Sequence, residues 1–125
     1  MEFHLEVPHD HFFIRSITAQ GIRVNEDYFN TPFIISGKRI VPEWHVESVD
    51  DINETNLEPV FELQPEIILI GTGASQVFLP PAIQIHFFRR QMGFEVMNTD
   101  AACRTFNVLA SEGREVVAAL IPVTL

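Results

Sequence analysis

Residues 94–121 read FEVMNTDAACRTFNVLASEGREVVAALI, and they predict a strand, a helix and a second strand in that order. The helix is expected to begin at Asn98 or Thr99, because either side chain can accept a hydrogen bond from a free N–H of the first turn. It is expected to extend to about Ser111. Residues 116–121 follow as a continuous apolar run, which is typical of a strand covered on both faces.

The same pattern begins one unit earlier in the chain. Residues 67–70 (IILI) form another continuous apolar run, which predicts a buried central strand, and residues 71–73 (Gly-Thr-Gly) close it. The proline pair at 80–81 suits the entry of a helix over about residues 82–92, with Gly93 as its stop. Strands and helices that alternate in this way predict an α/β fold, with helices on a mostly parallel sheet.

The first 46 residues predict a β-meander, because short β-branched and aromatic runs alternate with turn residues. Residues 40–46 are expected to form its last strand, with Pro42 at an edge or a bulge. In the acidic segment that follows, residues 56–59 are expected to begin a short helix. A chain of 125 residues is predicted to form one domain over residues 1–125, with residues 1–10 packing weakly or forming an edge.

The chain carries a net charge of −9 at pH 7, which disfavours binding to nucleic acid and to anionic membranes. Residues 47–66 contain seven acidic side chains and no Lys or Arg. This segment is either a solvated face or a docking patch for a basic partner. Cys103 is the only cysteine, so no internal disulfide forms. No membrane-spanning run and no signal-peptide pattern is evident, and a cytoplasmic location is expected.

A candidate ligand site lies on the helix that begins near Asn98. Asp100, Arg104, Asn107 and Ser111 recur on one helical stripe, and a guanidinium group offers a fork of donors to a carboxylate or phosphate. The alternative interpretation is an Asp100–Arg104 ion pair on a solvated face. Five further residues are candidates for ligand binding. They lie after the apolar run 67–70 and at the two ends of the same helix: Gly71, Thr72, Gly73, Thr99 and Arg114.

The sequence shows no combination of nucleophile, base and orienting group of the kind that an enzyme needs. Cys103 lies near a helix N-terminus, which can lower the pKa of a thiol, but a small packed thiol is favoured in this Ala-rich turn. His4, His9 and His11 are spaced for weak metal binding at most. No catalytic residue, no cofactor and no metal site is therefore predicted.

Five segments carry a family resemblance: residues 65–73 (PEIILIGTG), 93–99 (GFEVMNT), 101–109 (AACRTFNVL), 112–114 (EGR) and 118–120 (AAL). They resemble the small family shared by the mitochondrial NADH dehydrogenase (complex I) assembly factor 3 and the adipogenesis-associated domain protein, and in particular its bacterial members. The resemblance implies a three-layer α/β fold with a central mixed sheet. It implies no established enzymatic activity, and its mitochondrial members are non-catalytic factors of respiratory-complex assembly.

Two functional hypotheses follow from the sequence. The favoured one is a non-enzymatic, partner-binding domain of the assembly-factor type, with a protein as its partner. The alternative is a protein that binds a small anionic ligand, or an unrecognised enzyme, with its pocket near residues 71–73 and Arg104.

Overall fold

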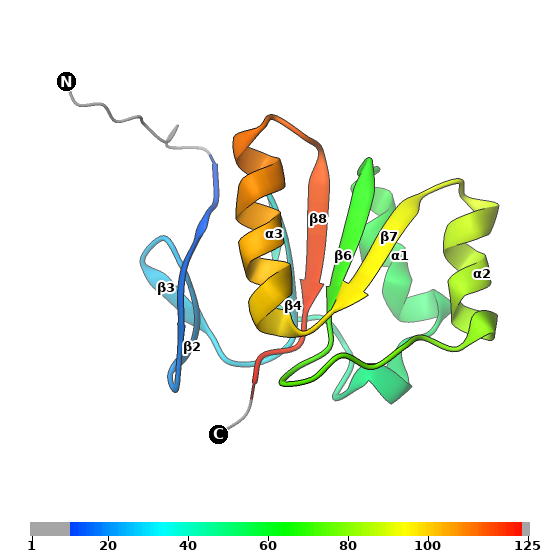
Figure 1. Cartoon of the computed structure of the whole chain (residues 1–125), viewed down its shortest axis with the longest axis horizontal. Coiled ribbons are helices and arrows are strands. Elements are labelled where there is room, and N and C mark those ends of the chain that lie inside the picture. The colour runs from blue at the N-terminus through cyan, green and yellow to red at the C-terminus, as the bar shows by residue number, and fades with distance from the viewer. Residues whose placement is uncertain (1–10, 124–125) are drawn as a thin grey trace.

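The computed structural model describes residues 11–123, and a five-stranded mixed sheet forms its centre (Figure 1). The strand order is β5-β4-β8-β6-β7. β6 pairs in parallel with both β7 and β8, whereas β4 pairs antiparallel with both β8 and β5. The bounds of these strands are Phe33–Ser36 (β4), Ile40–Val41 (β5), Ile67–Gly71 (β6), Gly93–Met97 (β7) and Val116–Leu120 (β8).

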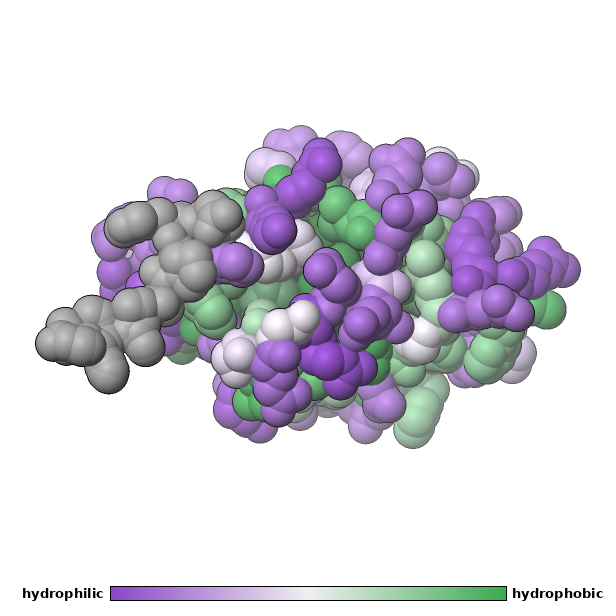
Figure 2. All heavy atoms as spheres, turned by 90° about the horizontal axis from the view of Figure 1, so that it is seen from above, coloured by the Kyte–Doolittle hydropathy of each residue, from purple (hydrophilic) through white to green (hydrophobic). Residues whose placement is uncertain are grey.

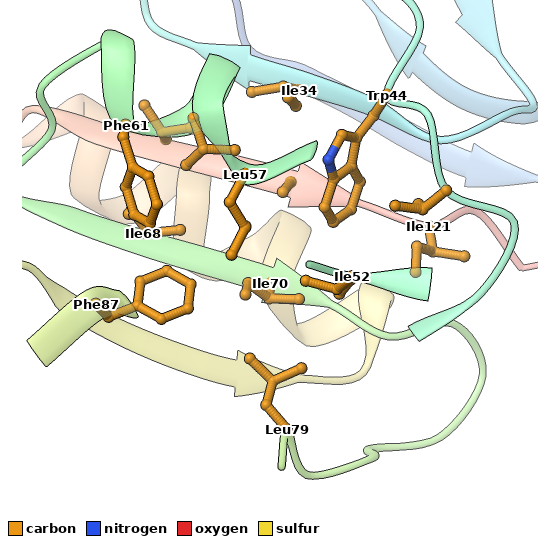
Figure 3. Packing of buried hydrophobic residues seen from close by; sticks show 14 residues of the cluster. Ile34, Trp44, Ile52, Leu57, Phe61, Ile68, Ile70, Leu79, Phe87 and Ile121 are labelled. Carbon is orange, nitrogen blue, oxygen red and sulfur yellow. The ribbon is translucent and has the colours of Figure 1, made fainter. Parts of the chain in front are cut away.

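Helices cover both faces of this sheet. They are a 3-10 turn at Val49–Asp51 (η1) and the α-helices Glu54–Glu62 (α1), Pro81–Arg89 (α2) and Thr99–Ser111 (α3). One face packs against α1 and α2, with Leu57, Phe61 and Phe87 in a single buried cluster (Figure 3). The opposite face packs against α3 through Ala102, Cys103 and Phe106, among others. The three-layer α/β prediction is confirmed.

Alternation along the central strands explains why their sequences are apolar throughout. Ile68 and Ile70 of β6 point into the cluster with α1 and α2, and Leu69 points into the cluster with α3. All three side chains are fully buried. Because successive side chains of a strand face opposite sides, a strand between two helical layers needs an apolar residue at every position. The prediction of a buried central strand here is confirmed.

The predicted meander divides into two parts. Only β1 (Ile14–Thr18), β2 (Gly21–Val24) and β3 (Asp27–Phe29) form a separate antiparallel sheet, which packs beside α3 (Figure 1). β4 is not part of this sheet; it belongs to the five-stranded sheet, where it pairs with β8. The single meander predicted through residue 46 is therefore wrong in its second half. Every position of Phe33–Ile35 is buried, which is the pattern of a central strand in a sheet with two covered faces.

Three predicted boundaries also change. The strand expected over residues 40–46 stops at Val41, because Pro42 offers no N–H and Trp44 turns into the core, where its indole N–H donates to the carbonyl of Asn56 at 2.8 Å. α1 begins before residue 56, since Asn53 caps it. α2 ends at Arg89 rather than near residue 92. Gln91, two residues later, has the left-handed backbone conformation with φ +55°. α3 has the predicted limits, with Asn98 as its cap.

Candidate functional site

The Gly71-Thr72-Gly73 turn and Thr99 form one buried junction between β6, α3 and β8. The Thr99 hydroxyl accepts a hydrogen bond from the Gly73 N–H at 2.7 Å and donates one to the Ile121 carbonyl at 2.6 Å. The Thr72 N–H donates to the Met97 carbonyl at 3.0 Å, and the Thr72 hydroxyl donates to the Ser75 carbonyl at 2.6 Å. The backbone N–H groups of Thr72 and Gly73 are thus already bonded to acceptors within the protein.

Gly71 allows the start of α3 to come this close to the sheet. A Cβ atom at position 71 would lie 2.9 Å from both the Leu120 Cδ2 atom and the Thr99 hydroxyl oxygen. Thr99 itself has no exposed surface. The sequence motif therefore serves close packing between helix and sheet, because no other residue fits at position 71 without a shift of its neighbours.

Arg104 and Asn107 lie farther along α3, beside β1. The Asn107 side-chain amide pairs with the backbone of Ile14, accepting from its N–H at 2.9 Å and donating to its carbonyl at 2.7 Å. Arg104 forms an ion pair with Asp100, and both side chains are exposed. This is the solvated ion pair that the alternative interpretation predicted. Together with Arg15 these two residues line an open cavity of about 210 Å³.

Arg114 lies beyond the other end of α3. Its guanidinium donates to a Glu66 carboxylate oxygen at 2.8 Å, and this hydrogen bond is the main reason that the pKa of Arg114 is raised. Gly113, at φ +79°, turns the chain between α3 and β8. Arg114 faces a different cavity of about 210 Å³, next to the turn that contains Lys38 and Arg39.

The candidate residues therefore lie at three places along α3 and do not line one pocket. The Thr99 hydroxyl both accepts and donates within the protein, and the Asn107 amide is bonded to the backbone of Ile14. The hypothesis of an anionic ligand stays a prediction, and the cavity at Arg15 and Arg104 is the location that remains for it.

Cys103 is a packed thiol on the inner face of α3, as the sequence favoured. It is buried against the sheet, and burial raises the pKa of the thiol from 9.0 to about 12, with a further increase from Asp100 and a decrease from Arg104. The low thiol pKa that a helix N-terminus can produce is not found here, because desolvation of the thiolate dominates.

This raised pKa predicts a loss of stability at alkaline pH. Below pH 9 the thiol is protonated in both the folded and the unfolded chain, so it adds no pH dependence. Between about pH 9 and 12 the unfolded chain ionises first, and the free energy of unfolding should fall by about 1.4 kcal/mol per pH unit. Urea unfolding at pH 8 and pH 10.5, compared between wild type and Cys103→Ala, measures this term. Equal pH dependence in both proteins would contradict it.

Sequence reasoning missed the exposed apolar surface around α2. Of the six large apolar side chains that are exposed within residues 11–123, four lie in and just before this helix: Val77, Phe78, Ile85 and Phe88. We call these four residues the α2 surface. Seen from above, the end of the molecule that α2 forms is mainly hydrophilic, with small hydrophobic areas at its margin (Figure 2). The available signal was that α2 is apolar on both sides, which one buried face does not require.

The inner side of α2 is held firmly against the core. Phe87 is fully buried, stacked on Phe94 at 4.5 Å and edge-on to Phe61 at 5.5 Å. Arg90 lies over the Phe61 ring at 4.2 Å, and its guanidinium is 3.7 Å from a carboxylate oxygen of Glu54 in α1. The two residues of the α2 surface that lie on the helix, Ile85 and Phe88, are therefore held in place by its packing against the core.

Residues 11–123 contain neither a membrane-spanning helix nor a metal-binding cluster. None of the helices is both long enough and apolar enough to cross a membrane. No three His, Cys, Asp or Glu side chains come together in a way that could hold a metal ion. His4 and His9, which the sequence placed with His11 in a weak metal site, lie outside the described residues.

The chain is similar in sequence to several known proteins. It is 38% identical over 112 residues to NADH dehydrogenase [ubiquinone] 1 alpha subcomplex assembly factor 3 of Xenopus tropicalis, which covers 88% of this chain and 61% of that protein. It is 30% identical to the 13 kDa major membrane protein of Francisella tularensis, covering 78% of this chain and 80% of the relative. The chain thus spans about 60% of the length of the assembly factors it matches.

Solved structures show the same fold. A Bordetella parapertussis protein is 33% identical with a TM-score of 0.85, covering 92% of this chain and 99% of the other. A Bordetella pertussis protein described as a Mth938-like domain is 27% identical with a TM-score of 0.85, covering 99% and 94%. The model of the family described as "Protein of unknown function (DUF498/DUF598)" matches residues 14–121. The resemblance to the assembly-factor family is confirmed, and the chain belongs to the DUF498/DUF598 family.

Proposed function

We propose that this chain is a non-enzymatic partner-binding domain of the assembly-factor type and that it binds its protein partner through the α2 surface. The observation that carries the proposal is the exposure of Phe78 and Phe88, whose side chains are 78% and 62% exposed. Large apolar side chains that remain uncovered along one helix and the segment that leads into it are the kind of surface that a protein partner can cover. The assembly-factor names of several relatives support the same class of function.

The arrangement of α2 suits such a role. Ile85 and Phe88 are one helical turn apart and both face outward, while Phe87 between them faces the core. The segment before the helix is fixed as well, because the Gln76 side chain donates to the Val96 carbonyl of β7 at 2.8 Å. A preorganised apolar surface loses little conformational entropy on binding, so its burial contributes efficiently to affinity.

Phe88→Asp is expected to abolish partner binding and leave the fold intact. Large aromatic anchors at interfaces commonly contribute 2 kcal/mol or more, so the affinity should fall by at least about 30-fold. The measurement is affinity capture of the tagged full chain from its native cells, followed by titration of the captured partner. Val108→Asp is the matched control, because Val108 is exposed to 55% on α3, which covers the opposite face of the sheet.

The two variants separate the possible outcomes. Loss of the same partner with Phe88→Asp but not with Val108→Asp supports the proposal. A partner that Phe88→Asp retains, or one lost equally with both variants, contradicts the assignment to the α2 surface.

A further inference from the structure

We propose that the partner segment that binds the α2 surface is amphipathic and that its polar side is acidic. This inference rests on the proposed function, in which α2 contacts the partner, and it adds the chemistry of the partner. It starts from the distribution of charge around α2, which is unlike that of the rest of the chain.

Acidic side chains are absent from a long stretch around the α2 surface. The chain has 17 Asp and Glu residues, yet residues 67–94 contain none, and the same residues carry Arg89, Arg90 and His86. The next acidic residue along the chain is Glu95, whose side chain lies on the edge strand β7. The charged side chains of α2 and of the segments beside it in sequence are thus all basic, in a molecule whose net charge is −9, and the acidic neighbour in space is Glu54 of α1.

Of the two arginines, Arg89 is the one placed to meet a partner. Arg90 is engaged by Glu54 and by the Phe61 ring, and Glu54 also lies 3.7 Å from His86. Arg89 is exposed and forms no ion pair with any residue of the described chain from 11 to 123. Arg89 lies four residues after Ile85, so it is on the same exposed side of α2 as Ile85, and it directly follows Phe88.

The local charge and the net charge predict opposite partners. Net charge alone favours a basic partner for this chain, whereas the border of the α2 surface favours an acidic one. At physiological ionic strength, interactions between exposed charges farther apart than about 8 Å are largely screened. Charges at the border of an interface therefore decide its preference. Of the acidic segment over residues 47–66, Glu54 lies against α2 and is paired with Arg90, so Arg89 is the charge left for a partner at this border.

A second copy of this chain is the less suitable occupant. In a symmetric dimer through the α2 surface, Arg89 of both copies would border the same interface, where like charges oppose pairing. The matching occupant is a segment of a different protein with apolar side chains on one side and Asp or Glu on the other. An amphipathic helix that lies along a helix surface is a common form of such recognition.

Two synthetic peptides test this inference on the full chain. Both are fluorescein-labelled amphipathic helices with the same Leu face, and the polar face of one carries Glu where the other carries Lys. By fluorescence anisotropy, the Glu peptide is expected to bind about fivefold tighter, with a difference that shrinks as salt is added. Arg89→Glu should reverse the preference, whereas Arg104→Glu, a change of the same charge on α3, should leave it unaltered.

Each other outcome has a definite meaning. Tighter binding of the Lys peptide that still depends on Phe78 and Phe88 overturns the acidic partner but leaves the proposed function in place. Binding of neither peptide, or binding that Phe88→Asp does not weaken, counts against both. If light scattering shows a dimer of the wild type and a monomer of Phe88→Asp, the occupant is a second copy and the inference is wrong.

Discussion

Thr99→Val is expected to lower the free energy of unfolding by about 2–6 kcal/mol, although the two side chains have nearly the same shape. The hydroxyl of Thr99 joins the Gly73 N–H to the Ile121 carbonyl, and Thr99 has no exposed surface. A methyl group in its place leaves one buried donor and one buried acceptor without partners, and each such loss costs about 1–3 kcal/mol. Urea unfolding followed by the fluorescence of Trp44, the only tryptophan and a buried one, measures the change.

Thr99→Ser is the matched control for this prediction. Serine keeps the hydroxyl and removes only the methyl group, so its cost should be clearly smaller than that of valine. A valine variant as stable as the wild type would show that the junction does not hold β6, α3 and β8 together. Residues 71–73 and Thr99 would then again be candidates for ligand binding.

Phe87→Ala is expected to be the most destabilising change on α2, with a loss of about 3–5 kcal/mol. The ring is fully buried between Phe61 and Phe94, so its removal leaves a cavity beneath the helix. α2 should then detach from the core and lose the geometry of the α2 surface. The same urea unfolding experiment measures the loss.

The adjacent Phe88→Ala provides the contrast. Phe88 is 62% exposed, and its one ring contact within residues 11–123 is an edge-on approach to Phe94 at 5.7 Å. Its removal should change the stability by no more than about 0.5 kcal/mol. Two neighbouring phenylalanines are thus expected to differ in kind, one needed for folding and the other for binding. Equal destabilisation by both changes would contradict this division.

The second half of the fold was readable from the sequence because its elements carry strong local signals. Residues 67–70 and 116–121 are apolar throughout, and Asn98 caps α3 where a cap was expected. The first half was less readable, because β4 pairs with β8 across more than 80 residues of chain. Such long-range pairing leaves no local pattern that distinguishes a strand of the mixed sheet from a strand of a meander.

The candidate site was predicted less well, and for a physical reason. Glycine, threonine and asparagine bind ligands with the same groups that they use to join a helix to a sheet. In this chain the Thr99 hydroxyl and the Asn107 amide make hydrogen bonds to backbone atoms that are distant in the sequence. The α2 surface escaped notice because an apolar helix is normally interpreted as a buried one, and only the structure shows that Phe78 and Phe88 remain exposed.

We propose that this domain acts through the α2 surface, while the polar residues of α3 hold the fold together. Hydrogen–deuterium exchange of the full chain, alone and bound to the partner it captures, tests this claim directly. Binding is expected to slow exchange in residues 77–90 and to leave exchange in residues 99–107 unchanged. Slower exchange around Arg104 and Asn107, with none at α2, would contradict it.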